Sequence, residues 1–261
     1  MLPRQELLRG ASDPAALEPL VAAAEETLRI WQPVWTPFLS AARREQAEEC
    51  LAGLSELRLH SEGGYPGAER RRLMLQRADS WGEPAAAATL LSGLEVRGNF
   101  LFDPAEPADV RAALVAAGAA DGELGDIWMR GDRGAQAIVT SPLAGRLDQG
   151  HAQVRSVAVD LVARPLAELQ LPAPRASRRF TSVEASLRLD ALASAGFGLS
   201  RGRMAALIRQ GAVRLNWRPI ANPSQQLVAG DRVQLEGRGE LVLEEAGLTR
   251  RDRWRVTLLR R

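Results

Sequence analysis

Five arginines between residues 188 and 216 are placed where their guanidinium groups could bind the phosphates of a nucleic acid. They are Arg188, Arg201, Arg203, Arg209 and Arg214. A guanidinium group presents several N–H donors in a planar fork and binds phosphate bidentately. The surrounding residues predict two short helices and a strand. We expect these elements to carry the five arginines on one polar face, which would suit a phosphate backbone.

The apolar residues of both predicted helices recur at helical spacing. They are Leu189, Leu192 and Ala193 in the first helix, and Met204, Leu207 and Ile208 in the second. Ser200 stands where the N-cap of the second helix is expected, and Gly211 where its left-handed C-cap is expected. After Gly211 the apolar period changes to two, with Val213 and Leu215 on one side, which predicts a strand.

This pattern resembles the S4, or αL-type, RNA-binding domain. The resemblance rests on five motifs: R-L-D at 188–190, L-S-R at 199–201, L-I-R-Q-G at 207–211, V-R-L-N at 213–216 and V-A-G-D-R-V at 228–233. By motif position, it implies RNA contacts for Arg188, Ser200, Arg201, Arg203, Arg209, Arg214 and Asn216. Gly202 departs from the family pattern, in which a larger polar residue is frequent.

Three further motifs are similar to the YlmH family: T-P-F-L at 36–39, G-G-Y-P-G-A-E-R-R-R at 63–72 and L-G-D-I at 124–127. The chain also resembles the branch named photosystem II S4 domain proteins. The family resemblance implies binding of structured RNA (rRNA and tRNA) on the large ribosomal subunit, in the rescue of stalled ribosomes. Ser40 stands where an acidic residue often follows T-P-F-L. A role in photosystem II biogenesis through RNA or protein contacts is an alternative.

The charge distribution supports a nucleic-acid surface near the C-terminus. Residues 1–174 contain 17 Arg and 24 acidic residues, a net charge of −7, whereas residues 175–261 contain 17 Arg and 8 acidic residues, a net charge of +9. Such an asymmetry favours an anionic partner for the basic end. All 34 basic residues are Arg. Lysine-dependent sites, such as a P-loop or a Schiff base, are therefore excluded.

The predicted fold class is α+β, in three parts. Residues 1–85 are expected to form an N-terminal helical segment with a Gly/Arg-rich hairpin, and helices are predicted over 14–31 and 40–54. Residues 86–170 show a β-α-β-β-α-β order, which predicts a ferredoxin-like or RRM-like α/β domain. Its last strand is expected at 152–161. Residues 180–261 form the predicted S4 domain, and their arginine-rich end is typical of a charged edge strand.

The glycine-rich stretch at 63–72 has two readings that the residues alone do not separate. Backbone amides around Gly63 and Gly64, with Arg70, Arg71 and Arg72, could form an anion nest and a secondary RNA contact. The same residues are equally typical of a turn between two strands with a solvated basic edge.

An RNA-modifying enzyme is the main catalytic alternative. G-R-L-D at 145–148 resembles the aspartate motif of pseudouridine synthases, but Q-G-H-A follows where Thr-Ser-Gly is expected. Asp148 is therefore predicted to be a surface carboxylate. His60 and His151 are 91 positions apart with no third ligand apparent, so we expect no metal, no cofactor and no catalysis.

The remaining signals concern the cellular compartment. Cys50 is the single cysteine, and its helical spacing with Ala47, Leu51 and Leu54 predicts a core thiol. The first residues lack the apolar segment of a signal peptide, and no apolar run is long enough to insert into a membrane. A cytoplasmic protein is expected. The sequence does not indicate an oligomeric state.

Overall fold

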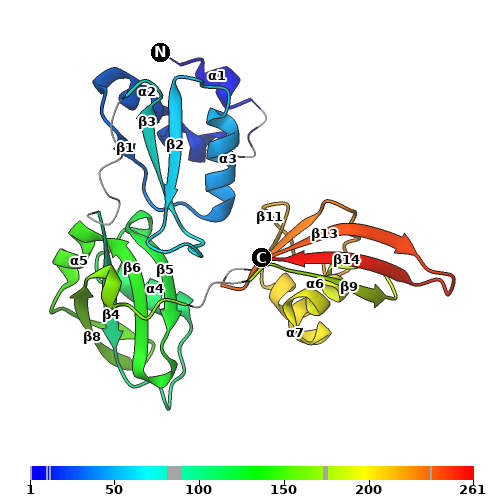
Figure 1. Cartoon of the computed structure of the whole chain (residues 1–261). Helices are drawn as coiled ribbons and strands as arrows, with labels where there is room; N and C mark the ends of the chain where they lie inside the picture. The colour runs from blue at the N-terminus through cyan, green and yellow to red at the C-terminus, as the bar shows by residue number, and fades with distance from the viewer. Residues whose placement is uncertain (1, 10, 12, 81–89, 173–175, 236) are drawn as a thin grey trace. The chain divides into compact units, whose positions relative to one another are not determined.

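A computed structural model describes residues 2–9, 11, 13–80, 90–172, 176–235 and 237–261. The chain divides into two compact units, Met1–Ala173 and Pro174–Arg261 (Figure 1). The N-terminal and central parts expected as separate domains both belong to the first unit. The expected boundary at residues 85 and 86 lies outside the described residues, so the division into three domains stays a prediction.

The N-terminal part packs helices against a small antiparallel sheet of order β1-β3-β2. Its elements are α1 (Arg4–Leu7), α2 (Pro14–Ile30), β1 (Val34–Trp35), α3 (Ala41–Leu51), β2 (Leu57–Glu62) and β3 (Arg72–Arg77). Both expected long helices are present. The α2 helix starts where Asp13 accepts a hydrogen bond from the Ala16 amide, and Ser40 caps α3 in the same way. Leu17 and Leu20 of α2 are buried in one core with Leu73 and Leu75 of β3.

The central part is a five-stranded antiparallel sheet of order β5-β6-β4-β8-β7. Its elements are β4 (Leu91–Arg97), α4 (Pro107–Ala116), β5 (Leu124–Met129), β6 (Gly134–Thr140), α5 (Ser141–Leu147), β7 (His151–Val154) and β8 (Val157–Arg164). The first four positions in this order reproduce the ferredoxin-like plait. The expected single strand at 152–161 is wrong, because the chain reverses at Arg155 (φ 54°). The result is the β7–β8 hairpin, which adds an edge strand.

The C-terminal unit is a six-stranded antiparallel sheet of order β11-β10-β12-β13-β14-β9, and α6 and α7 cover one of its faces (Figure 1). Its elements are β9 (Arg178–Glu184), α6 (Leu189–Phe197), α7 (Arg201–Arg209), β10 (Val213–Leu215), β11 (Arg218–Pro219), β12 (Arg232–Leu235), β13 (Gly239–Leu248) and β14 (Trp254–Arg260). The predicted two helices and strand are therefore present as α6, α7 and β10.

Two features of this sheet differ from the sequence-based expectation. Residues 178–184 form β9, a strand that the sequence did not predict. The β9 strand pairs along its whole length with β14, so the arginine-rich final strand is not an edge strand. It lies between β13 and β9, and its apolar residues Val256 and Leu258 are fully buried in the core beneath the helices.

Candidate nucleic-acid interface

The start of α7 is fixed by a local cap and by the core below it. Ser200 has extended backbone angles, and its hydroxyl accepts a hydrogen bond from the Arg203 amide at 3.3 Å. Met204 and Ile208 are fully buried against the sheet. These contacts set the rotation of α7 about its axis, and so decide which of its arginines face solvent.

Asp190 joins the two helices through a buried carboxylate. It accepts two hydrogen bonds from Arg188, at 3.0 and 2.9 Å, and one from Arg201 at 3.1 Å. Burial opposes ionisation of this carboxyl, but the hydrogen bonds and charges of the two arginines outweigh it and hold the pKa of Asp190 below its ordinary value. The cluster keeps a net charge of +1, and Arg201 remains 53% exposed. Both guanidinium groups are thus oriented before any ligand binds.

The outer face of α7 carries Arg203 and Arg209. Both are exposed, and within the described part of the chain neither has a carboxylate partner. Two small exposed residues, Gly202 and Ala206, lie on the same side. A Cβ at Gly202 would meet nothing within 4 Å. This face therefore offers two unneutralised charges beside small side chains, so the backbone of a nucleic acid can approach it closely.

The predicted site residues do not all share one surface. Val213 of β10 is buried under the helices, whereas its neighbour Arg214 is exposed. Successive strand side chains point to opposite faces, so Arg214 lies on the face of the sheet that α6 and α7 do not cover. The expectation of five arginines on one face is wrong in this respect, because periodicity separates Arg214 from Val213 but does not say where the helices pack.

Asn216 has a structural task in the turn after β10. It adopts a left-handed conformation (φ 47°), as does Trp217 (φ 66°). Its side-chain amide donates to Asp231 at 2.7 Å, and its side-chain oxygen accepts from the Arg232 amide at 2.9 Å. The turn residue that the S4 motif implied as an RNA contact thus ties β10 to the start of β12.

Sequence reasoning singled out Arg188 and Arg201 but missed Asp190, which positions them. The available signal was the carboxylate two residues after Arg188, at the first turn of a predicted helix. Its second partner is supplied by the next helix, and that pairing is visible only in three dimensions.

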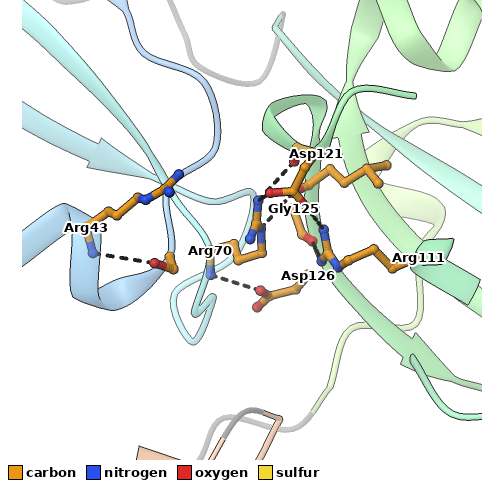
Figure 2. Close-up of polar contacts among 8 residues, drawn as sticks. Arg43, Arg70, Arg111, Asp121, Gly125 and Asp126 are labelled. Atoms are coloured by element: carbon orange, nitrogen blue, oxygen red, sulfur yellow. Dashed lines mark hydrogen bonds and ion pairs between the residues drawn. The ribbon is translucent and has the colours of Figure 1, made fainter. Parts of the chain in front are cut away.

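The loop at 63–72 binds carboxylates of the chain itself. Asp126 of β5 accepts hydrogen bonds from the amide of Glu69 at 2.8 Å and from the hydroxyl of Tyr65 at 2.8 Å. It also accepts a hydrogen bond from the Arg70 amide at 2.9 Å (Figure 2). The amides of Gly63 and Gly64 donate to Glu62 at 3.0 and 2.8 Å. The loop amides therefore do bind anions, but those anions are internal.

The three loop arginines are half-buried and already have partners. Arg70 donates to the Leu124 carbonyl at 2.8 Å and to Asp121 at 2.9 Å, and Arg111 binds the other oxygen of Asp121 at 3.1 Å (Figure 2). Arg71 donates to loop carbonyls, and Arg72 donates to the Thr36 carbonyl at 2.7 Å. These contacts favour a structural role, and an RNA contact at this loop stays a prediction.

The residues considered for other chemistry are also engaged structurally. Asp148 accepts a hydrogen bond from the Ala163 amide at 2.8 Å, at the end of α5. The Cys50 thiol donates to the Leu7 carbonyl at 3.0 Å, and burial raises its pKa. In the described ranges, no group of three or more His, Cys, Asp or Glu could hold a metal ion. No helix in those ranges is long and apolar enough to cross a membrane.

Comparison with known proteins identifies both ends of the chain. The family model described as "YlmH, N-terminal" matches residues 13–80, and the model described as "S4 domain" matches residues 187–233. The "Ribosome-associated protein quality control protein P2" of Bacillus subtilis (strain 168) is 30% identical over 226 residues, which cover 86% of each chain. The chain belongs to the YlmH family.

The YlmH model covers the N-terminal sheet and the loop that Asp126 holds, and the S4 model runs from α6 into β12. A solved structure named "Cell division protein ylmH from Streptococcus pneumoniae" has a TM-score of 0.48 and 20% identity, and the match covers 61% of this chain and 94% of that one. The C-terminal unit of this YlmH chain is an RNA-binding S4 domain, and it contains all seven residues of the candidate interface.

Proposed function

We propose that the chain is a non-catalytic RNA-binding protein that acts on the ribosome. Its S4 surface would bind structured rRNA or tRNA on the large subunit during quality control of stalled ribosomes. The relative from Bacillus subtilis is named for ribosome-associated quality control, and this name supports the ribosomal part of the proposal. A cytoplasmic location follows from this proposed action on the ribosome.

The observation that carries the proposal is the outer face of α7. Arg203 and Arg209 project from it without a described carboxylate partner. The exposed residues between them, Gly202 and Ala206, have small side chains or none. Arginine forks suit phosphate oxygens, and small residues let a sugar-phosphate backbone come close. The oriented pair Arg188 and Arg201 extends the same positive region to the start of α6.

The electrostatics at the start of α7 also favour phosphate binding. Arg201 and Arg203 occupy the first turn of α7, which contains no acidic residue. The positive end of a helix dipole disfavours cations there by about 0.3–1 kcal/mol each at exposed sites. Asp190 offsets this for Arg201, but no described residue does so for Arg203. A phosphate at this position would interact favourably with the helix end and with both guanidinium groups.

Sedimentation with separated ribosomal subunits tests the proposal. We expect the wild-type chain to sediment with the large subunit, and the double variant Arg203→Ala/Arg209→Ala to remain in the supernatant. The control Arg58→Ala/Arg133→Ala removes two exposed arginines from the first unit and should sediment normally. Sedimentation with the small subunit alone, or with neither subunit, would contradict the proposal.

The catalytic alternative has a separate test. Asp148 is engaged with the Ala163 amide, so we expect Asp148→Ala to leave RNA modification unchanged by mass spectrometry. Loss of a modified base in cells that carry only this variant would favour an enzyme.

A further inference from the structure

The turn between β13 and β14 carries a second group of arginines, far along the sheet from α7. Four arginines are exposed here: Arg250, Arg251 and Arg253 in the turn, and Arg255 in β14 beside it. In the described parts of the chain, none of the four forms an ion pair with a carboxylate. Asp252 is the one acidic residue within the turn, so this short segment keeps a strong positive charge.

Hydrogen bonds fix the conformation of this turn. The Thr249 amide donates to the Arg253 carbonyl at 2.7 Å, and the Arg253 amide donates to the Thr249 hydroxyl at 3.2 Å. Asp252 adopts a left-handed conformation (φ 52°), and its amide donates to the Thr249 carbonyl at 3.2 Å. The strand pairing continues to the turn, with Leu248 opposite Trp254. The arginines therefore project from a fixed scaffold.

A hollow lies beside these arginines, and its floor is partly apolar. It is lined by Val183, Ala246, Gly247 and Leu248, by Thr249 and Thr257, by Glu245 and by the four arginines. Val183 is 48% exposed, which is unusual for an aliphatic side chain of a paired strand. Glu245 accepts a hydrogen bond from Thr257 at 3.2 Å. The hollow thus combines exposed aliphatic surface with a cationic rim.

The hollow opens on the face of the sheet that α6 and α7 leave uncovered. Arg255 is paired with Val183 and Gly247, so these residues share one face. The neighbouring Val256 points into the helix-covered core. Figure 1 shows the turn at the end of the β13–β14 hairpin that is remote from the helices. The ten residues of β13 span roughly 33 Å, so one phosphate group cannot occupy both sites.

We propose that this hairpin hollow binds an unpaired stretch of RNA next to the structured RNA held by the α7 face. The inference rests on the proposed function. The rim matches the phosphate charge, and arginine can also stack on bases. The exposed Val183 offers apolar surface to a base on the same face as Arg255. Bases within a duplex are stacked on one another and unavailable to it. An unpaired segment presents both its phosphates and its base faces.

The test compares two RNA probes with the full chain: a blunt duplex, and the same duplex with a single-stranded oligouridine tail. We expect the wild type to prefer the tailed duplex by roughly tenfold, the scale of one base contact. Arg251→Ala/Arg255→Ala should bind both probes with the affinity of the wild type for the blunt duplex. Val183→Gln, which keeps the charge, should also lose much of the preference. Arg58→Ala/Arg133→Ala is the charge-matched control and should keep it.

The outcomes separate this proposal from the function on which it rests. Arg203→Ala/Arg209→Ala should weaken binding of both probes and retain the preference for the tail. If the wild type binds neither probe, the proposed function and this inference both fail. If the wild type binds both probes equally, or if the hairpin variants keep the preference, the hairpin inference alone is overturned. Displacement of the tail by polyglutamate at equal concentration would overturn it in favour of an acidic protein partner.

Discussion

Arg201 at the start of α7 donates a hydrogen bond of 3.1 Å to Asp190 at the start of α6. The same carboxylate binds Arg188 through two hydrogen bonds. A buried acid thus stands within the basic surface, where it lowers the net charge but fixes two guanidinium groups. Bidentate phosphate binding depends on such fixed geometry. We therefore assign Asp190 a positioning role and expect substitutions there to affect both folding and binding.

Replacing Asp190 with Asn should destabilise the C-terminal unit by about 1–2 kcal/mol, because charge-assisted hydrogen bonds are lost while both arginines stay partly solvated. Hydrogen exchange of the α6 and α7 amides measures the local opening free energy directly. Arg203→Ala serves as the control, since no described carboxylate pairs with Arg203. Unchanged exchange in Asp190→Asn would show that the Asp190 cluster does not hold the helices together.

The contribution of Asp190 should depend on pH in one direction. Its pKa is lower in the folded state than in the unfolded chain, where it is about 3.9. The stabilisation is therefore fully present above that unfolded value and is lost as the pH falls through the lower folded value. The difference in urea midpoint between wild type and Asp190→Asn should stay constant from neutral pH to about pH 5 and shrink below about pH 4. A difference that appears only above neutral pH would contradict this assignment.

Asp126 should be essential for the conformation of the 63–72 loop. Asp126→Asn replaces an acceptor of three hydrogen bonds with a group that can also donate, and should cost about 2–3 kcal/mol of unfolding free energy in the first unit. Tyr65→Phe removes one of the three and should cost about 1 kcal/mol. Faster hydrogen exchange at the Glu69 and Arg70 amides would locate the effect. Exchange equal to wild type would mean that these amides do not depend on Asp126.

Substitution of Asn216 should lower stability more than RNA affinity. Asn216→Ala loses two hydrogen bonds and puts alanine, which tolerates a left-handed conformation less well than asparagine, at this position. Together these effects should cost about 2 kcal/mol. Asn216→Gly loses the same bonds without the steric cost and should be less destabilised by about 0.5–1 kcal/mol. Melting temperatures of the two variants and RNA binding well below them provide the measurement. A folded Asn216→Gly chain that no longer binds RNA would instead favour a direct contact.

Local signals in the sequence predicted much of the architecture. The helix over 14–31 followed from Asp13, Pro14 and a regular apolar period, and α7 followed from Ser200 and Gly211. The β9 strand was missed because five of its seven residues are polar and because its partner β14 begins 76 positions after β9 begins. The turn at Arg155 was missed because neither glycine nor proline marks it. Long-range pairing and a left-handed arginine leave no short-range pattern.

The same distinction applies to the candidate site. Residue types and motif positions indicated which arginines to consider, because basic residues in a capped helix are local features. They did not indicate which arginines were already paired. Arg70 finds its carboxylate at Asp121, in the central part of the first unit, and Arg201 finds Asp190 in the preceding helix. Arg203 and Arg209 are distinguished from them only by the partners they lack among the described residues.

The most direct measurement is the salt dependence of RNA binding by Arg203→Ala/Arg209→Ala, with Arg58→Ala/Arg133→Ala as the control. If the two α7 arginines contact phosphates, the slope of log affinity against log salt concentration should fall in magnitude by about two, one for each lost contact. The thermal melt should be unchanged, because neither side chain has a described partner within the fold. If Arg203→Ala/Arg209→Ala keeps the wild-type slope, or if the control loses as much slope as this variant, RNA binding by the α7 face is contradicted.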